Sequence, residues 1–309
     1  MFTSLLNQNH SNWDTSNIPN LKGKTALITG ANSGLGYFTA KALAEKDCHV
    51  ILACRTLKKS DQAKYTLERI LPQAQLTTFE LNLSDFKNVS IKCDEILNKY
   101  KSLDLLINNA GIMHPPKTLN AQGYEIQIAV NHLSHMLLTL KLIPLIEKIH
   151  NSRIVTVTSG AQFFGKVGWD NLKAEKYYNK WESYANSKLA NVMFALELES
   201  KLSKKNILSL AAHPGIAKTN LFNAQKPNPT KFEKFSLELF SPMFQSAEMG
   251  SLPQLYAATS AKAKGGEHYG PKYNFRGYPK LSPTSPIALD KKERKILWDK
   301  SYEIIQEFI

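Results

Sequence analysis

The sequence predicts an α/β fold built on a doubly wound, mostly parallel sheet. Short apolar runs alternate with helical patterns along the chain, and a glycine-rich loop joins the first run to the first helix. The 309 residues, of which 43% are hydrophobic, supply a core large enough for one such sheet. An eight-stranded barrel uses similar units, but a glycine loop at this place favours an open sheet with a nucleotide at its switch point.

The elements of this sheet can be placed in order along the chain. Six apolar runs are predicted as strands, at Thr25–Thr29, Val50–Ala53, Leu76–Leu81, Leu103–Ile107, Ile154–Thr158 and Ile207–Ala212. Helical spacing predicts helices over 35–43, up to residue 71 before Pro72, over 89–97, over 124–149, over 184–202, and in the tail after Asp290. Ser84 is expected to cap the helix over 89–97.

Two segments interrupt the alternation, at 165–183 and 220–253. Irregular segments near the carboxyl ends of strands commonly build or cover a substrate pocket, so we expect both to act as substrate lids. Residues 1–20 are expected to form an N-terminal extension, and residues 21–309 a single domain that carries both lid segments.

Composition and charge exclude several classes of protein. The formal net charge is +13, but the lysines are scattered in separate clusters, which argues against a nucleic-acid partner. Cys48, Cys54 and Cys93 form no CxxC pair, so we expect a reducing compartment and no metal centre. The polar N-terminus lacks the pattern of a signal peptide, and the longest apolar stretch, 136–146, is too short to span a bilayer. A cytoplasmic protein without a transmembrane anchor is therefore predicted.

The glycine loop reads Thr29-Gly30-Ala31-Asn32-Ser33-Gly34-Leu35-Gly36. Gly30 permits a tight exit from the strand, and Gly34 and Gly36 allow a pyrophosphate to approach the positive N-terminus of the next helix. The alternative is an ordinary flexible turn, which the flanking strand and helix disfavour. The loop therefore predicts a dinucleotide site whose contacts come from Gly30, Asn32, Ser33, Gly34, Leu35 and Gly36.

The residue that follows the second strand discriminates between dinucleotides. An acidic side chain there would bind the ribose 2′-hydroxyl of NAD(H), whereas Arg55 can pair with the 2′-phosphate of NADP(H). The alternative is that Arg55 is a solvated surface arginine. We predict NADP(H) as the cofactor, in preference to NAD(H).

Tyr184 and Lys188 lie four residues apart and therefore share one face of the predicted helix. A phenol with a pKa of about 10 is a poor acid or base at neutral pH, and a nearby ammonium stabilises its anion and lowers that pKa. A tyrosine and a lysine with this spacing often occur together by chance, so their value as evidence for a catalytic site depends on the other motifs.

The order of the motifs resembles that of the classical short-chain dehydrogenase/reductase family. The resemblance covers about 21–219 and rests on the loop at 29–36, Asn108-Asn109-Ala110-Gly111, Asn131, Ser159, Tyr184 with Lys188, and Pro214-Gly215. It implies a Rossmann fold with four catalytic residues. Tyr184 would be the general acid/base and Ser159 would polarise the substrate oxygen. Lys188 would bind the nicotinamide ribose and tune Tyr184, and Asn131 would hold a water of the proton relay.

The resemblance also implies further contacts to the cofactor. On the adenosine side they are Asn109, Ala110 and Gly111, together with Asn82 and Leu83; beside the nicotinamide they are Pro214, Gly215, Ile216 and Thr219. Asn82 replaces the aspartate that the family usually has before leucine, and its amide can still donate and accept hydrogen bonds. Relatives often form homodimers through the helices that would carry Asn131 and Tyr184, and the insertion at 165–183 could obstruct that face.

More narrowly, the chain is similar to the branch of the retinol dehydrogenases and the WW-domain oxidoreductase. The similarity rests on Ala53-Cys54-Arg55, Val130-Asn131-His132, the gap of 25 positions between Ser159 and Tyr184, and His213-Pro214-Gly215. It implies reversible hydride transfer between NADP(H) and an aldehyde, ketone or alcohol, with an apolar substrate favoured.

Two other readings remain beside this one. The first is a non-catalytic, NADP(H)-binding regulatory protein on the same fold, because fold alone does not fix function. The second, a sugar-nucleotide epimerase or dehydratase, is disfavoured by the spacing of the glycines. His132 and His135 lie three residues apart, but no third ligand is evident, so we expect them to pack in the fold rather than to bind a metal ion.

Overall fold

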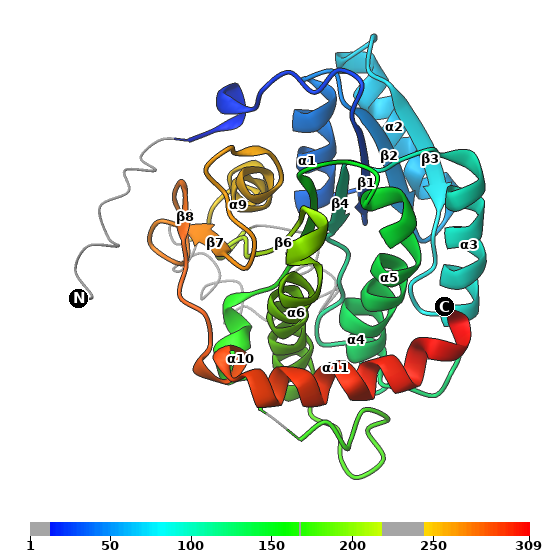
Figure 1. Ribbon diagram of the computed structural model, residues 1–309, viewed down its shortest axis with the longest axis vertical. Coiled ribbons are helices and arrows are strands. Elements are labelled where there is room, and N and C mark those ends of the chain that lie inside the picture. Colours follow the sequence, from blue (N-terminus) through cyan, green and yellow to red (C-terminus); the bar gives the residue numbers. More distant parts are fainter. Residues whose placement is uncertain (1–12, 167, 218–243) are drawn as a thin grey trace, which may run out of the picture.

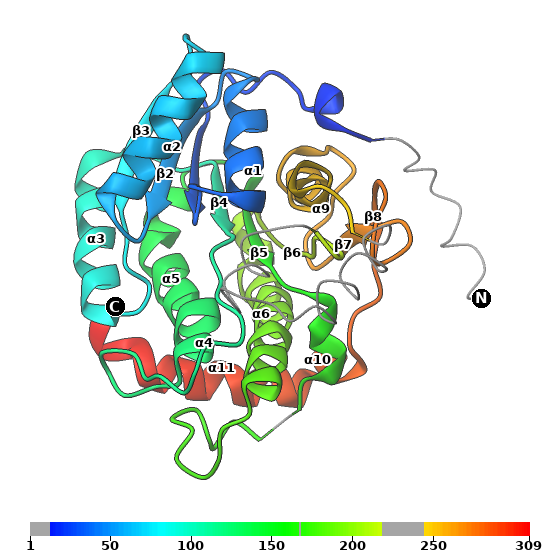
Figure 2. The same cartoon turned by 180° about the vertical axis from the view of Figure 1, so that it is seen from behind.

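The computed structural model describes residues 13–166, 168–217 and 244–309. Figures 1 and 2 show a twisted central sheet with helices on both faces. Its eight strands lie in the order β3-β2-β1-β4-β5-β6-β7-β8, all parallel except β8. Their bounds are β1 Thr25–Thr29, β2 His49–Cys54, β3 Leu76–Glu80, β4 Leu105–Asn108, β5 Ser152–Val157, β6 Ile207–Ala212, β7 His268–Pro271 and β8 Pro279–Leu281. The predicted fold class is confirmed.

The two faces of the sheet are covered by different helices. The first face carries α1 (Gly34–Ala44), α2 (Leu57–Ile70) and α9 (Ala247–Thr259), and the second carries α3 (Phe86–Lys99), α5 (Ser134–Ile146) and α6 (Lys180–Leu202). Successive residues of β1 alternate between them, because Ala26 and Ile28 pack with the first core and Leu27 with the second. Strands buried on both faces read as continuous apolar runs, which is why the sequence revealed them.

The six predicted strands are present, with ends that shift by one or two residues. Those at Thr25–Thr29 and Ile207–Ala212 begin and end as expected. Helix α9 and strands β7 and β8 were not predicted. Helix α9 is buried without interruption from Gly250 to Thr259, so it shows no amphipathic pattern. It begins at Ala247, inside the segment 220–253 that we expected to act as a lid.

The start of α3 corrects one expectation. Its N-cap is Asp85, not Ser84, because the Asp85 side chain accepts a hydrogen bond from Lys87 N. Ser84 instead donates from Oγ to Asn82 Oδ1, 2.7 Å away. Ile91 of α3 is 60% exposed, so it lies on the solvent side of this helix. Two adjacent polar residues can each cap a helix, and local spacing does not choose between them.

The long helical pattern over 124–149 is a composite element. It consists of the single turn α4 (Ile126–Ile128), a π-helical turn at Ala129–Leu133 and α5. By length and composition, 126–146 is the one described segment apolar enough to cross a membrane, yet 78% of its most apolar window is buried in the fold. Its burial against the sheet is that of a core helix.

The tail forms α10 (Pro286–Leu289) and α11 (Lys291–Ile305), and Asp290 caps α11 by accepting from Lys292 N. Figure 1 shows α11 lying across α6 and the α4 end of the neighbouring helical segment. Trp298 of α11 stacks on Phe194 of α6 with 6.0 Å between ring centroids. Helix α11 therefore covers part of the face through which a homodimer was expected to form.

Candidate active site

The glycine loop forms a close junction between β1 and α1. Gly30 and Gly34 have φ of +68° and +55°, which favours glycine over residues with a side chain. A Cβ on Gly36 would lie 2.3 Å from the Gly30 carbonyl oxygen, so only glycine permits this approach. Ser33 is the N-cap of α1, and within the described residues its side chain makes no capping hydrogen bond. The first N–H groups of α1 thus remain as donors at the positive end of the helix.

A cleft of about 210 Å³ opens over this junction, at the switch point between β1 and β4. Most of the predicted cofactor residues line it, namely Gly30, Asn32, Ser33, Gly34, Leu35, Gly36, Asn109, Ala110, Gly111, Tyr184, Lys188 and Pro214. Val157 and Thr158 also line it and were not predicted. Their position directly before Ser159, at the carboxyl end of β5, was the signal that would have identified them.

The other predicted cofactor residues lie outside these walls. Arg55 is exposed directly after β2, and Leu83 is 6% exposed, with its carbonyl accepting from Ser134 Oγ. Asn82 uses Oδ1 to accept from Ser84. Ile216 donates from its backbone N to Phe275 O. Gly215 lines the neighbouring cavity described below, and Thr219 lies outside the described residues.

Tyr184 and Lys188 lie in α6, one turn apart, as their spacing predicted. Lys188 Nζ donates to Val157 O over 3.3 Å and lies 5.8 Å from the centroid of the Tyr184 ring. Ser159 follows β5 and hydrogen-bonds the Tyr184 phenol. The structure therefore brings these three predicted residues together at the carboxyl edge of the sheet.

Asn131 occupies the π-helical turn beside Lys188. Its amide bridges backbone and side chain, because Oδ1 accepts from Ile112 N (2.8 Å) and Nδ2 donates to Ile112 O and to Ser187 Oγ. A Cβ on Gly111 would lie 3.3 Å from Lys188 Nζ and 3.4 Å from Asn131 Oδ1. The segment after β4, the π-helical turn and α6 thus meet around Gly111. Local π-turns of this kind occur frequently at functional sites.

Burial dominates the protonation of these groups. It raises the pKa of Tyr184 to about 12, and the hydrogen bond with Ser159 offsets part of that rise. It also lowers the pKa of Lys188 to about 8. The sequence pattern predicted a lowered phenol pKa; that prediction is wrong for this structure, because burial disfavours the phenolate and drives the lysine towards its neutral form. Tyr184 is a protonated phenol at neutral pH.

The buried lysine makes the stability of the fold depend on pH. Between pH 8 and 10.5 the unfolded chain holds a proton on Lys188 that the folded chain has lost, so the free energy of unfolding rises with pH. The rise from this group is on the order of 3 kcal/mol. Urea unfolding at the two pH values should show it in the wild type and not in Lys188→Met. The exposed control Lys101→Met should keep the wild-type rise, and parallel curves for Lys188→Met and the wild type would contradict the burial argument.

A second, larger cavity of about 670 Å³ adjoins the cleft. Its lining surface is mostly apolar, with Leu35, Met113, Ala161, Phe164, Trp181, Ala185 and Ala217 beside Ser159, Tyr184, Pro214 and Gly215. Three further polar residues, Lys166, Asn179 and Glu182, also line it. His114 also lines it, with its ring centroid 3.6 Å from that of Trp181. Met113, His114 and Trp181 were missed by the sequence analysis; the first two lie two and three residues after Gly111, the last residue of the Asn109–Gly111 motif, which was a usable signal.

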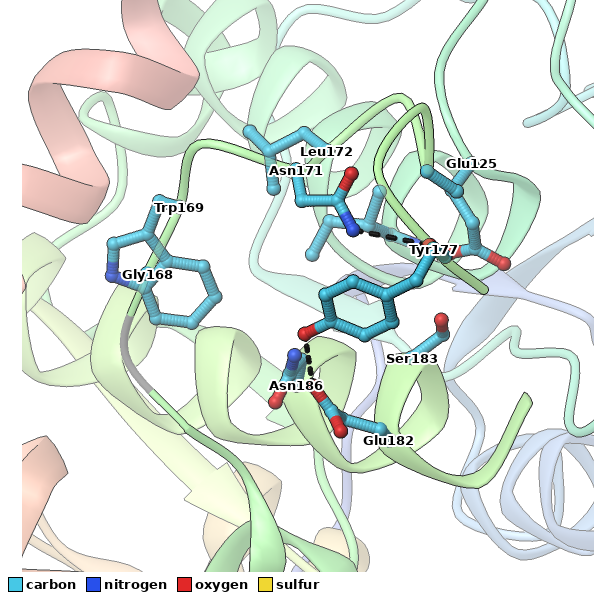
Figure 3. A pocket seen from close by; sticks show the side chains of 11 residues that line it. Glu125, Gly168, Trp169, Asn171, Leu172, Tyr177, Glu182, Ser183 and Asn186 are labelled. Carbon is cyan, nitrogen blue, oxygen red and sulfur yellow. Dashed lines mark hydrogen bonds between the residues drawn. The ribbon is translucent and has the colours of Figure 1, made fainter. Parts of the chain in front are cut away.

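The insertion at 165–183 is held against the start of α6. Figure 3 shows the Tyr177 phenol pointing to Glu182 and the Asn171 amide reaching the backbone of Tyr177. Lys166 adds an ion pair of 3.4 Å to Glu182. A cavity of only about 50 Å³ remains beneath. Residues 180–183 of the segment already belong to α6, so these contacts are made to the first turn of the helix that carries Tyr184.

The two histidines singled out in the sequence are buried and partnered. His132 Nε2 lies 2.8 Å from Ser301 Oγ of α11, and His135 contacts Thr29 and the backbone of Asn131. Burial lowers the pKa of both rings, to about 3 and about 4. Over the described ranges, no group of three His, Cys, Asp or Glu side chains is placed to hold a metal ion.

The model of the short chain dehydrogenase family matches residues 24–230. This chain belongs to that family. Retinol dehydrogenase 14 of Mus musculus is 36% identical over 293 residues, which cover 91% of this chain and 85% of the relative. This short-chain dehydrogenase therefore lies in the retinol dehydrogenase-like branch and is an oxidoreductase.

Two solved structures resemble this short-chain dehydrogenase. The crystal structure of a putative uncharacterized protein from Mycobacterium Paratuberculosis has 32% identity and a TM-score of 0.79, and the match covers 96% of this chain and 98% of that one. A putative NAD(P)-dependent gluconate 5-dehydrogenase from Beutenbergia cavernae, with bound NADP, has 21% identity and a TM-score of 0.64, with coverage of 81% and 96%. The second likeness shows the fold alone.

Proposed function

We propose that this protein is an NADP(H)-dependent oxidoreductase that interconverts an apolar aldehyde or ketone and the corresponding alcohol, with Tyr184 as general acid/base. One observation carries the proposal. Tyr184 lines both the cleft over the glycine loop and the mostly apolar cavity beside it, and Ser159 bonds its phenol. A proton donor is thus held where the cleft over the glycine loop meets a mostly apolar pocket.

The chain's residues fit a bound NADP(H). The N–H groups in the first turn of α1 can donate hydrogen bonds to a pyrophosphate. The close backbone contact between Gly30 and Gly36 leaves the loop without side chains that would block it. Lys188 lines the cleft, where its Nζ would meet a ribose hydroxyl. Arg55 is exposed beside the β1–β2 edge and would pair with a 2′-phosphate. The bound NADP of the gluconate 5-dehydrogenase-like structure agrees with this assignment.

The catalytic roles follow from protonation and geometry. When bound, NADPH supplies the hydride that reduces the carbonyl carbon. Ser159 would donate a hydrogen bond to the carbonyl oxygen, and the protonated Tyr184 phenol would give that oxygen its proton. Lys188, at the phenol's side, would stabilise the resulting phenolate, and Asn131 would hold the water that returns the proton.

The alternative function is a non-catalytic NADP(H)-binding regulator on the same fold. Purified protein should be tested with NADPH against a panel of aliphatic and aromatic aldehydes, ketones and alcohols, following the absorbance of the reduced nicotinamide. We expect turnover with apolar aldehydes, because the pocket lining is mostly apolar. Tight NADPH binding with no turnover on the whole panel would favour the regulator and refute the enzyme.

The cellular setting remains part of the proposal. The three cysteines are free and buried, which suits the reducing cytoplasm. Burial raises the pKa of Cys54 to about 11, so its thiol is protonated and unreactive at neutral pH. We therefore propose a cytoplasmic enzyme of small-molecule substrates, without a nucleic-acid partner.

A further inference from the structure

His135 lies at the centre of a buried hydrogen-bond chain between the glycine loop and Asn131. Its ring is 1% exposed in the first turn of α5. Nδ1 lies 3.0 Å from the Asn131 carbonyl oxygen and Nε2 lies 2.9 Å from Thr29 Oγ1. The two ends of one imidazole therefore contact the last residue of β1 and the π-turn.

The chemistry of the partners fixes the tautomer of this ring. A carbonyl oxygen only accepts, so His135 Nδ1 must carry the proton and donate to Asn131. Burial lowers the pKa of His135 to about 4, so the ring is neutral at pH 7 and Nε2 is bare. The Thr29 hydroxyl therefore donates to Nε2 at 2.9 Å in preference to Ile107 O at 3.4 Å.

The Thr29 end of the chain holds the wall of the cofactor cleft. Because the Thr29 hydroxyl donates its hydrogen bond to His135, its Oγ1 is available as an acceptor. It accepts hydrogen bonds from the backbone N–H groups of Asn109 and Ala110, each over 2.9 Å. Asn109 in turn donates from Nδ2 to Thr29 O over 2.8 Å. The strand ends of β1 and β4, which form the floor of the cleft, are thus tied through one hydroxyl whose direction His135 sets.

The Asn131 end of the chain holds the catalytic side. Asn131 lies beside Lys188 Nζ across Gly111, and its side chain is already committed to Ile112 and Ser187. Its carbonyl, in the π-turn, is fixed from the other side by His135. A donor at this oxygen sets the position of the turn relative to Lys188.

From these contacts we propose that His135 is a positioning residue that holds the cofactor cleft through Thr29 and the catalytic Asn131 through its carbonyl. This inference rests on the proposed function, because it assigns a role within the same site. Its two ring nitrogens act on two separable properties, NADPH affinity at the Thr29 end and turnover at the Asn131 end. A residue that merely fills core volume has no such division.

Two amide variants of His135 separate the effects of its two ring nitrogens. In His135→Asn the amide nitrogen takes the place of Nδ1, so the bond to Asn131 is kept and the bond to Thr29 is lost. In His135→Gln the amide oxygen takes the place of Nε2, so the bond to Thr29 is kept and the bond to Asn131 is lost. We expect His135→Asn to raise the Kd for NADPH about tenfold at near-constant kcat, and His135→Gln to lower kcat about tenfold at near-constant Kd.

The control is His132→Asn, because His132 is an equally buried histidine of the same segment that bonds Ser301 on the side away from the cleft. It should lower Tm and leave the Kd for NADPH and kcat within about twofold of the wild type. The Kd is measured by NADPH fluorescence titration and kcat with octanal and benzaldehyde. His135→Phe should show both losses.

The outcomes separate this inference from the proposed function. An active wild type whose Asn and Gln variants change the two parameters equally, or change neither, overturns the role of His135 and leaves the enzyme assignment intact. A wild type that binds NADPH but reduces neither aldehyde counts against the proposed function. In that case the Kd values still decide the inference: unequal Kd for the two variants supports the Thr29 link, and equal Kd refutes it.

Discussion

Replacing Tyr184 by phenylalanine removes turnover and leaves NADPH binding intact. The phenol is the one proton donor that lines both cavities among the described residues, and burial keeps it protonated at neutral pH. Loss of a positioned general acid lowers kcat by about 10² to 10⁴-fold. The phenyl ring keeps the packing against His114, whose ring centroid lies 5.3 Å away. We therefore expect an unchanged Tm and a Kd for NADPH within about twofold of the wild type.

The matched control for this variant is Tyr177→Phe. Tyr177 also bears a hydroxyl close to the pocket region, but it is 55% exposed and bonds Glu182 rather than Ser159. Its loss should leave kcat close to the wild-type value. Undiminished turnover in Tyr184→Phe, measured by NADPH oxidation with an aldehyde substrate, would reject the mechanism.

Replacing Arg55 by aspartate reverses the preference between the two dinucleotides. The guanidinium is exposed directly after β2 and has no competing ion pair within the described part of the chain. Loss of a charge-assisted hydrogen bond, with a carboxylate put in its place, should raise the Kd for NADPH roughly 100-fold. NADH carries no 2′-phosphate, so its Kd should fall or stay unchanged.

Arg69→Asp provides the control for the change in net charge. Arg69 is equally exposed but lies in the last turn of α2, at the other end of the helix that follows Arg55. Its variant should bind both dinucleotides like the wild type. If Arg55→Asp weakened NADPH and NADH equally in fluorescence titrations, the assignment of the 2′-phosphate to Arg55 would be wrong.

The sequence predicted those parts of the fold in which one physical signal dominates. Strands β1, β2, β4, β5 and β6 contain apolar runs because both of their faces are buried, whereas the edge strand β3 is only partly buried. The residues of the glycine loop were predicted because Gly30, Gly34 and Gly36 have backbone demands that other residues do not meet.

The elements that were missed lack such a signal. Helix α9 is buried on every side from Gly250 to Thr259 and contains Pro253, and β7 contains Gly270, over which the ring of His213 packs. A Cβ on Gly270 would lie 2.0 Å from His213 Nε2, a constraint that only the folded structure reveals. In the site, the wall formed by Met113, His114 and Trp181 comes from segments whose path depends on tertiary contacts.

The central claim is that a hydride passes from NADPH to a carbonyl carbon beside Tyr184. The most direct test supplies NADPH deuterated at the transferring position of the nicotinamide, together with octanal, and analyses the alcohol by mass spectrometry. We expect the wild type to form alcohol that carries the deuterium on its carbinol carbon, and Tyr184→Phe to form none. Alcohol formed without the label, or equal labelled product from both proteins, would contradict it.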